Sequence, residues 1–212
     1  MNEILLSQSQ VDESTESVKN DGLIINECLV KNWDLTHVLP ELSNGNILDM
    51  GCYGSLVLAN AVRMGIKGDK CGVDLNPLTE GMIVTGCLYS VGDMCNTNYP
   101  NDHFHTITCL SVVEHGVDIN AFAMESSRLL KSGGSLMVTC DYWPDRYQNL
   151  PGGCFIFCKE DLERLIETCN NFRLLMTEPM NWEYKDKVID ASLYYPVKDV
   201  GYTFAYLKFV KS

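Results

Sequence analysis

Positive charge is scarce in this chain of 212 residues. Lysine and arginine together number 16 against 28 aspartates and glutamates, so the formal net charge at pH 7 is −12. A field of that sign repels phosphate backbones, and direct binding of nucleic acid is not expected. No apolar run approaches the roughly eighteen residues that suggest a membrane span. The N-terminus also lacks a basic segment followed by a long apolar run, so we expect a cytoplasmic protein without membrane contact.

Paired cysteine spacing is missing as well. The ten cysteines are scattered between Cys28 and Cys169, and no two of them have the C-x-x-C spacing of a zinc or redox motif. Several lie inside apparent strands, where a thiol behaves as a small hydrophobic group. We therefore expect reduced structural cysteines and neither a disulfide framework nor a metal site.

The chain also lacks a dinucleotide-binding motif, which narrows the class of ligand that it is expected to bind. Residues 46–77 read as a short strand, a glycine turn, an apolar-periodic helix and a second strand that ends at Asp74. A βαβ unit with an acid about twenty residues after its first glycine predicts a nucleoside site at the carboxyl ends of the strands. The dinucleotide motif G-x-G-x-x-G is not present, because Tyr53 stands two residues after Gly51 and no third glycine follows at the required spacing. A tyrosine there crowds a diphosphate but need not exclude an amino acid. The alternative is an ordinary strand–helix turn in another α/β protein.

Alternating strand and helix patterns predict an α/β fold, a Rossmann-like doubly wound sheet that is mainly parallel. We expect strands at about 46–50, 70–74, 87–91, 105–110 and 135–140. We expect helices at about 54–65, 77–84, 118–131 and 159–169, the third of them capped by Asp118.

The two ends of the chain do not follow this alternation of strands and helices. Residues 172–176 and 202–210 read as further strands, and an antiparallel C-terminal strand pair at the sheet edge is plausible from their long polar connection. Residues 1–20 are polar and are expected to be loosely ordered, and a helical pattern follows at 23–39. We divide the chain into an N-terminal polar segment and helix at 1–44 and one domain at 45–212.

Three short segments of the chain carry recognisable motifs. Residues 47–54 follow the pattern apolar-apolar-Asp-apolar-Gly-Cys-Gly, with Tyr53 in place of the middle glycine. Residues 112–115 form a strand end with the sequence apolar-Glu-His, and residues 127–134 form a glycine turn in which Ser132 stands where a proline is usual. In order and spacing the three segments resemble class I SAM-dependent methyltransferases, where SAM is S-adenosyl-L-methionine. The resemblance covers residues 45 to 212 and implies a seven-stranded sheet with one reversed strand, and SAM as the cofactor.

The same resemblance implies the residues that hold the cofactor. Asp74 falls where the family keeps its ribose-binding acid. Asp93 would accept a hydrogen bond from the adenine amino group, and Met94 would pack on the ring. The residues expected at the cofactor are Asp49, Gly51, Cys52, Tyr53, Gly54, Asp74, Leu75, Asp93, Met94 and Ser111.

Methyl transfer from a sulfonium is an in-line displacement for which a protein mainly supplies orientation. His115 is the candidate general base, since an imidazole titrates near neutrality. The other interpretation, which we favour, is that Glu114 and His115 brace the following helix and the cofactor loop. Asp141 is either a second base, a group that orients a substrate hydroxyl, or a cap for the next turn. A metal site built from Glu114, His115, Asp118 and Asp141 has no distinctive spacing, so no metal is expected.

The acceptor is less clearly indicated. Tyr142, Trp143 and Tyr147 either form an aromatic wall against a sugar face or pack in the core. Residues 140–144 and 154–162 resemble methyltransferases encoded beside bacterial surface-glycan genes, which implies a small-molecule or carbohydrate acceptor methylated at oxygen. The alternative function is a SAM- or adenosine-nucleoside-binding protein without transferase activity, acting as a regulator or a partner subunit. A homodimer is compatible with either function.

Overall fold

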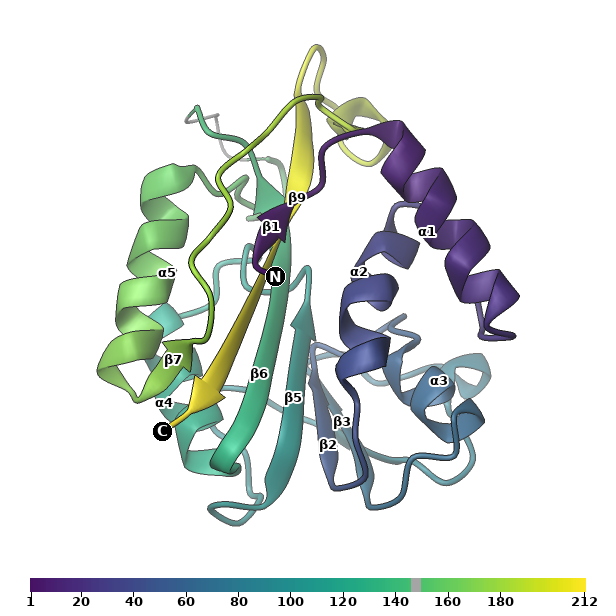
Figure 1. Ribbon diagram of the computed structural model, residues 1–212, viewed down its shortest axis with the longest axis vertical. Coiled ribbons are helices and arrows are strands. Elements are labelled where there is room, and N and C mark those ends of the chain that lie inside the picture. The colour runs from purple at the N-terminus through teal and green to yellow at the C-terminus, as the bar shows by residue number, and fades with distance from the viewer. Residues whose placement is uncertain (146–149) are drawn as a thin grey trace.

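The computed structural model describes residues 1–145 and 150–212. A central sheet carries helices on both faces (Figure 1). One face is covered by α4 (Ile119–Leu129) and α5 (Lys159–Asn171), and the other by α1 (Gln8–Asn20), α2 (Lys31–Val38) and α3 (Val57–Arg63). Each face has its own cluster of buried apolar side chains, so the sheet is enclosed between two cores.

Five parallel strands form the centre of the sheet, in the order β6-β5-β2-β3-β4. They are β2 (Ile47–Met50), β3 (Lys70–Asp74), β4 (Leu88–Val91), β5 (Phe104–Leu110) and β6 (Leu130–Tyr142). The chain moves outward from β2 to β3 and β4, and then returns to the other side of β2 with β5. Ligands of open α/β sheets bind where the strand order reverses in this way, so the carboxyl ends of β2 and β5 mark the expected crevice.

One long strand, β9 (Gly201–Lys211), runs antiparallel to β6 and completes the sheet. It also pairs in antiparallel fashion with β1 (Glu3–Ile4), β7 (Leu174–Met176) and β8 (Ile189–Asp190). The predicted mainly parallel, Rossmann-like sheet with an antiparallel C-terminal pair is confirmed. The expected seven strands become nine within residues 1–145 and 150–212, because the two-residue strands β1 and β8 join the sheet.

The prediction that residues 1–20 are loosely ordered is wrong. Val11 and Val18 lie seven residues apart on one face of α1, and both are buried where α1 packs on α2. Asn2 ties β1 to the far end of the chain, since its side chain accepts a hydrogen bond from the Lys208 amide (2.6 Å) and donates one to the Glu178 carbonyl (2.6 Å). Two valines among polar residues were too weak a pattern to predict a packed helix.

Two predicted helices differ clearly from their expected bounds. At 77–84 only a single 3₁₀ turn forms, η2 (Glu80–Met82), because Gly81 and the β-branched Ile83 and Val84 disfavour a helix. The helical pattern at 23–39 becomes helical only at Lys31, followed by η1 (Leu39–Glu41). Before it, the Asn26 side chain accepts the Cys28 amide proton (2.9 Å), which is a local turn that competes with helix formation.

The start of α4 is as predicted. Asp118 Oδ1 accepts hydrogen bonds from the backbone amides of Asn120 (2.9 Å) and Ala121 (3.2 Å), which caps the helix. All ten cysteines have free thiols. Within the described residues, no helix is both long enough and apolar enough to cross a membrane.

Candidate cofactor and acceptor site

A cavity of about 840 Å³ lies at the carboxyl ends of the central strands. This volume is near the upper end of the range for small-molecule sites. Most of the residues predicted at the cofactor or in catalysis line it, namely Gly51, Tyr53, Gly54, Asp74, Leu75, Asp93, Met94, Ser111 and His115. The lining does not include Asp49, Cys52 or Asp141.

The turn after β2 brings the backbone to the floor of the cavity. Gly51 has a φ of +73°, and a Cβ at this position would lie 2.3 Å from a methyl carbon of Val112. Only glycine fits both the left-handed conformation and the close approach. The Gly51 amide donates to the Val73 carbonyl (2.8 Å), which fixes the turn against the end of β3.

Asp74 ends β3 and holds this turn from the side. Its Oδ2 accepts the Tyr53 amide proton (3.0 Å), and its Oδ1 accepts the Asn76 amide proton (2.8 Å). A carboxylate has about four acceptor positions, so both oxygens can still accept hydroxyl donors from a ligand. Tyr53 itself has 48% of its surface exposed and borders the cavity, so it is not a core residue.

Asp49 lies beneath the turn and is buried. Its Oδ1 accepts the Thr108 hydroxyl proton (2.6 Å), and its Oδ2 has no hydrogen-bond partner in the part of the chain that is described. Burial raises the pKa of Asp49 to about 6, against the opposing effect of the neighbouring Ser55 and Thr108 hydroxyls. The geometry makes Asp49 a support for the β2–β5 crevice that does not reach the cavity surface.

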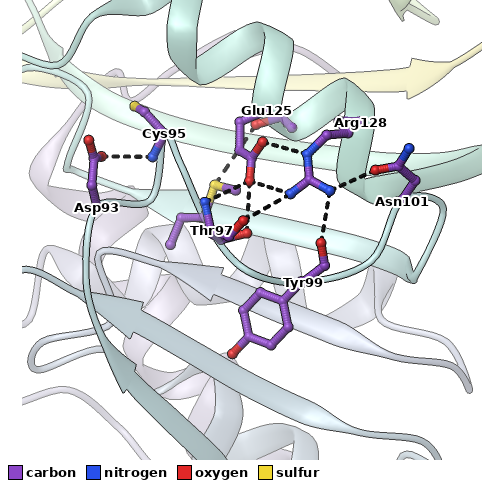
Figure 2. Close-up of polar contacts among 9 residues, drawn as sticks. Asp93, Cys95, Thr97, Tyr99, Asn101, Glu125 and Arg128 are labelled. Atoms are coloured by element: carbon purple, nitrogen blue, oxygen red, sulfur yellow. Dashed lines mark hydrogen bonds and ion pairs between the residues drawn. The ribbon is translucent and has the colours of Figure 1, made fainter.

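The loop after β4 brings Asp93 and Met94 to the cavity. Asp93 Oδ1 accepts the Cys95 amide proton (2.8 Å), so the carboxylate is fixed at one oxygen (Figure 2). Further along the loop, Glu125 and Arg128 of α4 bind residues 97–101 through a set of hydrogen bonds (Figure 2). The loop is therefore anchored to α4 on the side away from the cavity.

A second group of polar residues lines the opposite end of the cavity. Ser111 directly follows β5 with a φ of +53°, an unfavourable conformation for a residue other than glycine. The Lys31 ammonium of α2 donates a hydrogen bond to the Ser111 hydroxyl. His115 also lines this end, and its imidazole makes no hydrogen bond to a described residue. Burial, and secondarily the charge of Lys31, lowers the pKa of His115, which favours the neutral imidazole.

Glu114 and Asp141 form a buried acidic pair behind this end of the cavity. Glu114 Oε1 accepts the Asp141 amide proton (3.2 Å), which joins the loop after β5 to the end of β6. Burial and the neighbouring Asp141 raise the pKa of Glu114 well above its ordinary value. Burial also raises the pKa of Asp141 to about 6, and its Oδ2 faces the Cys154 thiol (3.8 Å). Among the described contacts, Glu114 rather than His115 makes the side-chain bond that braces the backbone here.

Four of the lining residues that the sequence did not predict come from the N-terminal segment. Asn26, Lys31, Asp34 and Leu35 all line the cavity. Asp34 is 1% exposed, and neither of its carboxylate oxygens has a hydrogen-bond partner among the described residues. Burial raises its pKa to about 6 despite Lys31 nearby. Lysine and aspartate three residues apart on a short polar helix are common on surfaces, so the sequence offered no signal for them.

The aromatic wall and the metal alternative find no support in the described residues. Tyr142 and Trp143 are buried and do not line the cavity, as the packing interpretation expects, while Tyr147 falls outside the described residues. No group of three or more histidines, cysteines or acids is placed to hold a metal ion in the part of the chain that is described. The four residues considered for a metal site belong to no such group.

Strand order, a glycine turn and a strand-terminal acid at one cavity together define a nucleoside-binding α/β protein of the Rossmann-like kind. Comparison with known proteins specifies the family. A family model described as a methyltransferase domain matches residues 48–138. A curated ubiquinone biosynthesis O-methyltransferase from Xanthomonas euvesicatoria pv. vesicatoria (strain 85-10) is 31% identical over 109 residues, which cover 47% of this chain and 44% of the relative. The chain thus matches less than half the length of that relative.

Solved structures show the same fold. A geranyl diphosphate C-methyltransferase from Streptomyces coelicolor A3(2), in complex with Mg²⁺, geranyl diphosphate and S-adenosyl-L-homocysteine, matches with a TM-score of 0.60 at 16% identity, over 84% of this chain and 78% of that one. The [4+2]-cyclase SpnF matches equally well, with a TM-score of 0.60 at 16% identity, over 84% of this chain and 80% of that one. Residues 48–138 thus match a methyltransferase domain, and the resemblance to class I SAM-dependent methyltransferases that the sequence motifs indicated is confirmed.

Proposed function

We propose that the chain is an enzyme that transfers the methyl group of SAM to an oxygen atom of a small molecule. The observation that carries this proposal is Asp74, a carboxylate fixed by two backbone amides and still open to a cavity floored by the Gly51 turn. A ribose with two adjacent hydroxyls matches those open acceptor positions. Oxygen as the acceptor atom is supported by the curated O-methyltransferase that matches part of the chain.

The cavity has a suitable group for each part of the cofactor. In this proposal the ribose lies at Asp74, the adenine at Asp93 and Met94, and the methionine portion beside Tyr53 and the Gly51 turn. Leu75, Gly54 and Ser111 complete the lining around the cofactor, and Asp49 and Cys52 support the turn from beneath. The sulfonium then points toward the end of the cavity that contains Lys31 and His115.

The acceptor is proposed to bind at that end, with His115 as the general base. The acceptor oxygen attacks the methyl carbon as the carbon–sulfur bond breaks, and the hydroxyl proton passes to the neutral imidazole. The products are a methyl ether, S-adenosyl-L-homocysteine (SAH) and a protonated His115. Asp141 does not reach the cavity, so its proposed contribution is to position Glu114 and the end of β6.

The finer properties of the acceptor remain proposals. The described lining contains Lys31 as a basic residue against Asp34, Asp74, Asp93 and Asp118, which favours an acceptor without negative charge. A neutral carbohydrate satisfies that condition, and we propose it as one class of acceptor. A cytoplasmic location and a homodimer also stay predictions.

Binding and turnover must be tested separately, because one fold can serve several functions. Calorimetry with SAM and SAH measures cofactor binding. SAH release is then followed with small phenols, alcohols and sugars as acceptors, with heat-denatured protein as the control. Methyl ether formation supports the proposal. Tight SAM binding without turnover on any hydroxyl acceptor supports the alternative of a SAM-binding regulator or partner subunit, and absence of SAM binding contradicts both.

A further inference from the structure

A set of hydrogen bonds between α4 and the loop after β4 lies outside the cavity but close to its adenine end. Glu125 Oε1 accepts both the amide and the hydroxyl protons of Thr97, at 2.8 Å each. Arg128 Nη1 donates to the Tyr99 carbonyl (2.8 Å) and to Asn101 Oδ1 (2.7 Å), and Nη2 donates to the Thr97 carbonyl (3.2 Å). Figure 2 shows this arrangement, which we call the α4 latch, comprising Thr97, Glu125 and Arg128.

The α4 latch is rigid because its two charged members also bind each other. The Arg128 Nε lies 2.7 Å from Glu125 Oε2, and Nη2 lies 2.6 Å from Oε1, a bidentate pair. The Glu125 side chain is only 7% exposed. Although burial opposes it, the hydrogen bonds from Arg128 and Thr97 hold the pKa of Glu125 below its ordinary value. The pair therefore stays charged and directional at neutral pH.

The same helix and the same loop form two walls of the cavity. Asp118 and Ala121 line it from the first turn of α4, and Asp93, Met94 and Cys95 line it from the loop. Ala121 and Arg128 are seven residues apart, about 10 Å along the helix axis. Neither Glu125 nor Arg128 lines the cavity, so they act on it only through the position of the loop.

We propose that the α4 latch positions Asp93 against the first turn of α4 and thereby sets the selectivity of the site for an adenine base. The proposal rests on the function proposed above, because it requires a SAM-type cofactor in the cavity. Asp93 Oδ1 already accepts the Cys95 amide proton, so the remaining acceptor positions face the ligand only when the loop is held in place. A base that donates from its 6-amino group is accepted there, and a base with a 6-oxo group is rejected.

The test compares SAH with S-inosylhomocysteine, in which an oxo group replaces the 6-amino group, by calorimetry. Wild-type protein is expected to prefer SAH by roughly 10- to 100-fold, the range for one hydrogen bond to a charged group. In Glu125→Gln and in Arg128→Lys this ratio of affinities should fall below about 3-fold, because the loop no longer holds the Asp93 carboxylate in place beside the base. Two controls should keep the wild-type ratio. Glu163→Gln removes an exposed ion pair to Lys159 on α5, and Leu165→Val weakens the core at a residue of α5 that takes no part in the hydrogen bonds of the latch.

The outcomes separate the two proposals. A wild-type protein that binds neither ligand refutes the proposed function itself. A wild-type protein that binds both ligands equally, or folded latch variants that weaken both ligands by one factor and keep the ratio, refute only the role of the latch. If Glu125→Gln fails to fold, Thr97→Val provides the test. It removes the hydrogen bond from the Thr97 hydroxyl to Glu125 and leaves the Glu125–Arg128 ion pair intact. At least a 2-fold fall in the ratio is then expected, and an unchanged ratio overturns the proposal.

Discussion

Replacement of Asp74 by alanine is the most informative test of the cofactor site. In the proposed complex two ribose hydroxyls donate to this carboxylate, and hydrogen bonds to a charged group contribute about 1.5–3 kcal/mol. Some of that is regained from water at a partly open site, so we expect SAM binding to weaken by about 2–3 kcal/mol, roughly 30- to 150-fold in Kd. Calorimetry with SAM and SAH measures the change directly.

The structure predicts that Asp74→Ala also loses some folding stability, which the sequence did not indicate. Asp74 also accepts the amide protons of Tyr53 and Asn76, so the alanine variant loses two local hydrogen bonds and about 1 kcal/mol of stability. Asp190→Ala is the matched control. Asp190 Oδ1 accepts the amide proton of Ser192, two residues on (2.9 Å), in the same local geometry and away from the cavity. A folded Asp74→Ala protein with unchanged SAM affinity would refute the assignment of this residue.

Three further perturbations test other parts of the site. Tyr53→Gly should change SAM affinity and leave the free energy of unfolding within about 1 kcal/mol, because the ring is half exposed; a collapsed melting temperature with normal affinity would contradict this. His115→Ala should lower the methylation rate about 10²–10⁴-fold with little effect on SAM affinity. The wild-type rate should fall as the pH drops through a pKa below the usual 6.5, since burial and Lys31 lower it, and a pH profile of unchanged shape in the variant would show that His115 is no base. Asp34→Asn should raise stability at pH 8 by up to about 3 kcal/mol and by little at pH 4, because the folded-state pKa of about 6 exceeds the ordinary 3.8 and the penalty grows as pH rises through that window. Equal effects at both pH values in chemical denaturation would refute the raised pKa.

The parallel half of the fold and the cofactor end of the site could be predicted because their signals are local. The Gly51 turn, Asp74 at the end of β3 and the Asp118 cap each depend on a few neighbouring residues. Their patterns also repeat at the regular spacing of a doubly wound sheet. Patterns of this kind can be recognised in the sequence because the residues that form each turn, strand end or helix cap are neighbours along the chain.

The acceptor end could not be predicted, because it is assembled from distant segments. Lys31 meets Ser111 across eighty residues, and the burial of Asp34 depends on how α2 packs on the sheet. The polar residues 1–20 were misread for the same reason. Their order comes from α2 and from β9, which no periodicity within the segment reveals.

The strand β9 also determines how the chain must fold. Figure 1 shows β9 beside β1, β6 and β7, and β9 also pairs with β8. The register of β1 with β9 joins Glu3 to Tyr206. Contacts of such large sequence separation form slowly, since a long loop must close before they stabilise anything. Until β9 docks, the edge of β6 is open to pairing with other chains. Aggregation during refolding is therefore expected to compete with the docking of this one strand, and a peptide that copies residues 201–211 should act as an inhibitor of refolding that leaves the folded protein untouched.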